Sequence, residues 1–222
     1  MLESFATVAV NGWAVLTCKE AEDRDSEILI AGGGAAVTVM VAEDDFVGSP
    51  TLVALIDEGK IRPDSLVELA RSGIGMAIKA GSSVPDISSL EALNRTLLAA
   101  KSIAYSSSAS GVYLSNELFS KLGIAGQIKS KCRAIEGEPV GEAVASGDAE
   151  IGFQQISELL PVKGIVLVGP LPVGAQRITV IAAGIPTASK NPEAAQALIK
   201  FLASSAAAAA IRQSGLEPVN PK

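Results

Sequence analysis

Short apolar runs alternate with amphipathic stretches along most of the chain, and this alternation predicts strands and helices in turn. Runs rich in β-branched and other apolar residues predict strands at 5–9, 28–31, 73–79, 102–105, 128–134, 150–154, 165–168 and 177–183. Apolar residues at helical spacing predict helices at 50–59, 89–100, 112–122, 139–145, 155–160 and 192–213, the last as one long helix or a pair. The pattern is typical of the α/β class.

The serine-rich stretch KSIAYSSSASGVYLSNELFSKLGI, residues 101–124, carries the strongest candidate for a site. It predicts a strand, a loop of small residues at 106–111, and then a helix. Unpaired backbone N–H groups and the helix dipole make such a helix start able to bind an anion, and serine hydroxyls add further donors. In the simpler alternative, the serines only cap the helix and line a solvated loop.

Composition narrows the function classes. The chain has 222 residues with a net charge of −6, which argues against nucleic-acid binding. It contains no histidine, so the usual catalytic triads and most zinc sites are excluded. Cys18 and Cys132 fit two small buried hydrophobic residues, and a disulfide between them is the alternative.

Three further patterns bear on function. The glycines at 32–34 follow a predicted strand, but the β-branched residues after them make a poor helix, so a dinucleotide site is disfavoured.

No run is long and apolar enough to span a membrane, so no membrane insertion is expected. The N-terminus lacks the features of a signal peptide. We therefore expect a periplasmic protein if Met1 replaces a removed signal peptide, and a cytoplasmic one otherwise.

Four segments resemble the type II periplasmic solute-binding proteins of ABC importers, most closely the molybdate-binding-like branch. They are PTLVALIDEGKIRPDSLVEL with LARSGIGMAIKAGS, AYSSSASGVYLSNELFSKLGI, GEPVGEAVASGDAEIGFQQISELL and RITVIAAGIPTASKNPEAAQALIKFLASSAAAAAIRQSGLEP. The likeness covers about 51–218 and is weakest over the first 45 or so residues.

This resemblance implies a two-lobed α/β fold of the type II periplasmic-binding-protein kind, with mixed sheets flanked by helices. The first lobe would comprise 1–75 and 177–222, and the second 76–176. A small anionic ligand, either an oxyanion or a small carboxylate, would bind in a cleft between the lobes. The implied partner is an ABC importer permease. Such proteins need no cofactor and do no chemistry on the ligand, so no enzymatic activity is expected.

The resemblance also implies a set of binding residues. In the second lobe they are the hydroxyls and backbone N–H groups of Ser107, Ser108, Ser110, Gly111, Val112 and Tyr113, the helix start at Pro139 and Val140, and Gln154. Of Gln154 and its neighbour Gln155, one is expected to face the cleft and the other to face away. In the first lobe the candidates are Asn11, Gly12, Gly33, Gly34 and Ala35.

Two other functions fit the same fold. One is a cytoplasmic ligand sensor or regulatory protein, which would need a partner chain. The other is an enzyme that works through serine or carboxylate groups without histidine. A binding protein that has lost its ligand is also compatible with the short first-lobe segment.

Overall fold

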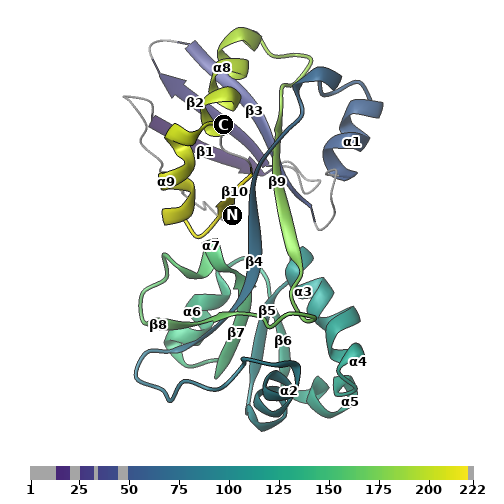
Figure 1. Cartoon of the computed structure of the whole chain (residues 1–222), viewed down its shortest axis with the longest axis vertical. Helices are drawn as coiled ribbons and strands as arrows, with labels where there is room; N and C mark the ends of the chain where they lie inside the picture. The colour runs from purple at the N-terminus through teal and green to yellow at the C-terminus, as the bar shows by residue number, and fades with distance from the viewer. Residues whose placement is uncertain (1–13, 21–25, 33–34, 45–49, 220–222) are drawn as a thin grey trace. The chain divides into compact units, whose positions relative to one another are not determined.

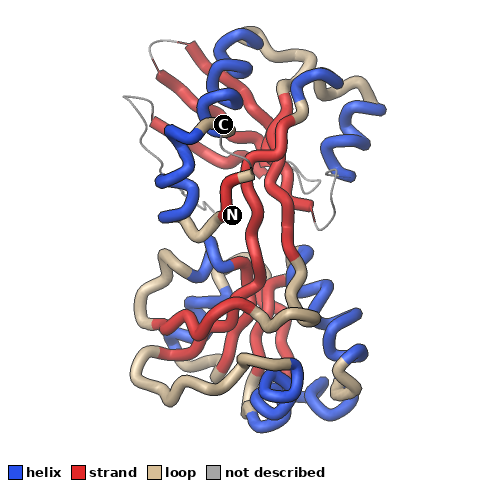
Figure 2. Tube along the Cα trace, viewed as in Figure 1, coloured by secondary structure: helices blue, strands red, loops and turns tan. Residues whose placement is uncertain are grey.

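The computed structural model describes residues 14–20, 26–32, 35–44 and 50–219, with side-chain surroundings from residue 54 onward. The chain has the expected α/β structure, with sheets flanked by helices (Figures 1 and 2). It divides into two compact units, unit 1 from 1–71 and 179–222 and unit 2 from 72–178. The unit boundaries lie four residues before and two residues after the expected lobe boundaries at 75 and 176. That these units act as ligand-binding lobes stays a prediction.

Unit 1 contains an antiparallel sheet. The strands β1 (Ala14–Glu20), β2 (Ser26–Gly32), β3 (Ala35–Asp44) and β9 (Ile178–Gly184) follow one another in it. The short β10 (Glu217–Pro218) pairs with the start of β4 (Val67–Lys79). Gly32 pairs with Ala35 across the β2–β3 hairpin. The next described element after β2 is a strand and not a helix, whereas a dinucleotide site requires a helix there.

Helices complete unit 1. They are α1 (Pro50–Asp57), the 3-10 turn η1 (Pro63–Ser65), α8 (Pro192–Leu202) and α9 (Ser205–Gln213). Ala195 and Ile199 of α8 are fully buried against Leu69, Ala183 and Ile185. Within the described ranges no single helix is long and apolar enough to cross a membrane; α8 and α9 pass by length and composition only as a pair, bent by 69°.

Unit 2 is built on a mixed sheet. Its parallel strands are β5 (Ile103–Ser106), β6 (Cys132–Ile135) and β7 (Ile151–Gln155), with β5 in the middle. The strand β4 runs antiparallel to β7 and also pairs with β8 (Ile165–Pro170).

Alternate residues of these strands supply two cores on opposite faces. Ile103 belongs to the larger core, and Ala104 belongs to the smaller one. The larger core is covered by α2 (Leu90–Ala99), α3 (Ala109–Tyr113), the π-helical η2 (Leu114–Leu118), α4 (Phe119–Lys121) and α5 (Ala125–Ile128). The smaller core is covered by α6 (Val140–Ser146). The 3-10 turn η3 (Lys129–Lys131) precedes β6, and α7 (Ile156–Leu159) follows β7.

The structure corrects three boundaries. The strand expected at 73–79 begins earlier, at Val67, because Arg71 pairs with Glu217 and the side chain of Gln176 bonds both backbone groups of Ile74. The strand expected at 128–134 is only Cys132–Ile135, since the chain before it turns helically in α5 and η3. The loop expected at 106–111 ends at Ser108, and Ser110 and Gly111 belong to α3.

Gly111 allows α3 to lie directly against the end of β5. A Cβ at this position would sit 1.6 Å from the carbonyl oxygen of Ser106 and 3.0 Å from the ring of Tyr105. No side chain fits in that space, so only glycine permits this approach.

We therefore expect Gly111→Ala to destabilise the protein by at least about 2 kcal/mol, because the clash is with backbone and cannot be relieved by a rotamer change. Urea denaturation followed by circular dichroism measures the change. Gly126→Ala on α5 is the matched control, because nothing lies within 4 Å of its added methyl group. Equal midpoints for the two variants would contradict the close-contact explanation.

Candidate functional site

The candidate site lies in unit 2, at the edge where the parallel strands end. Carboxyl ends of parallel strands meet at one edge, so the segments after β5, β6 and β7 gather there. The chain leaves β5 for α3 on one face of the sheet and leaves β6 for α6 on the other. Ligands of α/β proteins bind at such a reversal of connections.

Three serine hydroxyls meet at the end of β5. Ser106 Oγ lies 2.7 Å from Ser108 Oγ and 3.1 Å from Ser110 Oγ. Ser106 and Ser110 are buried, whereas Ser108 is exposed. We call these residues the serine cluster. Ser107, which was expected to contribute a hydroxyl, is exposed and its backbone N–H donates to Ile135 O at 3.0 Å.

Ser106 was missing from the expected site residues, although its position as the last residue of the strand was a usable signal. Strand alternation places Ser106 on the same side of the sheet as Ala104. The close approach of Gly111 then brings Ser110 to Ser106, which no spacing argument reveals.

Two of the expected backbone donors already have partners within the protein. The Val112 N–H donates to Ser108 O at 3.0 Å, as in any helix. The Val140 N–H, at the start of α6, donates to Gln154 Oε1 at 2.8 Å. Both therefore lack the free N–H group that the resemblance implied.

Gln154 has a clear structural role. Its side chain is 8% exposed and caps α6, whose N-cap residue is Pro139. Gln155 is 3% exposed, so both glutamines are buried. They are successive residues of β7 and point to opposite faces of the sheet. Which of them faces a ligand stays a prediction.

Tyr113 is held by its neighbours. Its hydroxyl donates to Ala175 O at 3.0 Å, and the guanidinium of Arg177 lies 4.0 Å over its ring. Arg177 also donates two hydrogen bonds to Glu117, at 3.1 and 2.7 Å. Burial raises the pKa of Tyr113, and the charge of Arg177 partly opposes that rise. Arg177 was not expected in this region, because nothing in the sequence links it to a helix some 60 residues earlier.

The first-lobe candidates are only partly placed. Asn11, Gly12, Gly33 and Gly34 lie outside the described residues, and Ala35 is the first residue of β3. The described side chains form no group of three or more residues able to hold a metal ion.

Comparison with known proteins gives the family. The family model of bacterial extracellular solute-binding proteins matches residues 31–217. This chain belongs to that family. Solved structures agree: the substrate-binding domain of a molybdenum ABC transporter from Clostridium difficile matches with a TM-score of 0.64 at 22% identity, over 81% of this chain and 76% of that one. An ABC-transporter substrate-binding protein from Agrobacterium tumefaciens has a TM-score of 0.60 at 12% identity, over 82% and 64%. The expected type II periplasmic-binding fold is confirmed.

A sequence relative changes the functional expectation. Aconitate isomerase from Pseudomonas sp. is 48% identical over 173 residues, which cover 78% of this chain and 66% of that protein. The chain thus spans just under two thirds of the length of that relative. The expectation of no enzymatic activity was wrong, because a relative this similar is named as an enzyme.

The cap on α6 is testable. We expect Gln154→Leu to lower the free energy of unfolding by about 1–3 kcal/mol, because the buried Val140 N–H would lose its acceptor. Thermal melts and urea denaturation measure the loss. Gln127→Leu, at an exposed position on α5, makes the same chemical change and should have little effect. A Gln154→Leu protein as stable as the control would show that the cap contributes nothing.

Proposed function

We propose that this chain binds a small polycarboxylate of the aconitate type and isomerises it. The observation that carries the proposal is the 48% identity, over 78% of this chain, with a protein named aconitate isomerase. The family match supports the coarser half of the proposal, which is capture of a small solute.

The serine cluster is suited to a carboxylate. Each hydroxyl both donates and accepts, so the three can turn their protons away from one another and toward an incoming carboxylate oxygen. Ser106 and Ser110 are 6% and 1% exposed. Hydrogen bonds made there to an anion are stronger than the same bonds in water.

The isomerisation requires proton transfer without a cofactor. A proton leaves the methylene carbon beside one carboxylate, the double bond moves along the carbon skeleton, and a proton returns at the far carbon. The composition of the substrate is unchanged. Because the chain has no histidine, a carboxylate is the natural proton carrier. Glu136 and Glu138 are exposed in the loop between β6 and α6, at the same edge as the serine cluster. We assign the proton transfer to one of these two residues.

Solute capture for an importer is the second candidate function. The family description and the ABC-transporter proteins of the same fold support it. In this role the protein would work outside the cytoplasmic membrane and deliver its ligand to a permease. Molybdate is not carried over as the ligand, since 22% identity supports the fold alone.

Incubation of the protein with trans-aconitate, followed by proton NMR, tests the proposed activity. We expect conversion to cis-aconitate, and we expect Ser108→Ala and Ser110→Ala each to lower kcat/KM at least about tenfold, because each removes a hydrogen bond to a charged group. Ser120→Ala, an exposed serine on α4, is the matched control and should retain full activity.

Tricarballylate, the saturated analogue, separates binding from turnover because it has no double bond to move. Glu136→Gln or Glu138→Gln should abolish turnover while tricarballylate still raises the melting temperature. Tricarballylate binding without any turnover by the unmodified protein would favour solute capture over isomerisation. If the protein neither binds tricarballylate nor converts trans-aconitate, both the isomerisation and the capture of such a polycarboxylate are overturned.

A further inference from the structure

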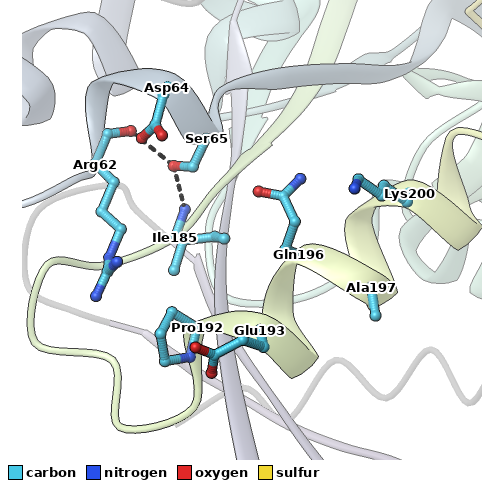
Figure 3. A pocket seen from close by; sticks show the side chains of 9 residues that line it. All are labelled: Arg62, Asp64, Ser65, Ile185, Pro192, Glu193, Gln196, Ala197 and Lys200. Atoms are coloured by element: carbon cyan, nitrogen blue, oxygen red, sulfur yellow. Dashed lines mark hydrogen bonds between the residues drawn. The ribbon is translucent and has the colours of Figure 1, made fainter.

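Unit 1 contains a pocket that neither the serine cluster nor the proposed activity uses. Its volume is about 450 Å³, within the range of small-molecule sites. The η1 turn and the residue before it form one wall, residues between Pro192 and Lys200 of α8 form the other, and Ile185 lies between them (Figure 3). All the lining residues belong to unit 1.

Arg62 is the most informative residue of this pocket. Its Nε–H group is buried and has no hydrogen-bond partner among the described residues. The turn that carries it is rigidly tied, since Ser65 Oγ donates to Arg62 O at 2.7 Å and accepts from Ile185 N at 2.8 Å. A buried donor without an acceptor costs free energy, and an acceptor on a ligand would remove that cost.

The remaining charges of the pocket are of both signs. Lys200 adds a second cation, and Asp64 and Glu193 add two carboxylates, so the lining is formally neutral. Within the part of the chain that the structure describes, no ion pair involves any of these four charged side chains. Gln196 lies one helical turn from Lys200 on α8 and points into the same pocket, where it offers a neutral donor and acceptor (Figure 3).

We propose that this pocket binds a small zwitterion of the amino-acid type. Its carboxylate would accept from the fork of Nε–H and Nη–H donors of Arg62, and its ammonium group would be held by Asp64 and Glu193. A doubly charged anion such as phosphate is disfavoured, because the two acids cancel the two cations. A ligand with both charges pairs with Arg62 and with the two acids, and Lys200 keeps the lining formally neutral.

Isothermal titration of the full chain tests this proposal. The zwitterionic probes are L-alanine, β-alanine and 4-aminobutanoate, which differ in the separation of their charges. Propionate, propylamine and inorganic phosphate each carry one kind of charge. We expect at least one zwitterion to bind saturably with a Kd below about 10 mM. The Kd of each of the three single-charge probes should be at least about tenfold higher.

Variants locate the binding. Arg62→Gln should weaken the zwitterion about tenfold or more, whereas Arg71→Gln removes the same charge at an exposed position outside the pocket and should change nothing. Glu193→Gln should weaken the zwitterion but leave the weak affinity for propionate unchanged. Thermal melts establish that each variant is folded. The proposal is overturned if no zwitterion binds, if propionate binds as well as the zwitterions do, or if folded Arg62→Gln binds like the unmodified protein.

Discussion

The contact between Gly111 and the carbonyl group of Ser106 determines the local structure of the candidate site. Because position 111 has no side chain, the first turn of α3 lies against the last residue of β5. That approach brings the hydroxyls of Ser108 and Ser110 to the hydroxyl of Ser106. A larger residue would move the helix outward and separate the three oxygens. The binding chemistry proposed for this edge thus depends on a steric condition at one glycine.

Two amide side chains, one buried and one half-buried, make hydrogen bonds at this edge that backbone groups would otherwise make. Gln154 accepts the N–H that would otherwise be unpaired at the start of α6. Gln176 pairs with both the N–H and the C=O of Ile74 and so continues the hydrogen bonding of β4. Side chains thus take the place of backbone partners at two points of this edge.

The relationship to an isomerase shows how far a fold constrains function. The family is defined by solute binding, yet a relative at 48% identity is named as an enzyme. Activity depends on a few groups in a site, and the same scaffold can carry either role. The expectation of a pure binding protein rested on the family resemblance, and the relative named as an enzyme overturns it. Carboxylates also transfer protons when their surroundings adjust their pKa values.

The sequence by itself determined the α/β class, the solute-binding family and the position of the serine-rich stretch. Hydrophobic periodicity, glycines at helix ends and the four family-like segments are all local properties of the chain. Most strands and helices of unit 2 were predicted for the same reason. Only the tertiary structure decided that β4 begins at Val67, that Ser106 joins the cluster, and that Arg177 stacks on Tyr113. It also decided that the N–H of Val140 has a partner in Gln154. These outcomes depend on contacts between residues that lie far apart in the chain or on a single close approach, and neither leaves a pattern in the order of the residues.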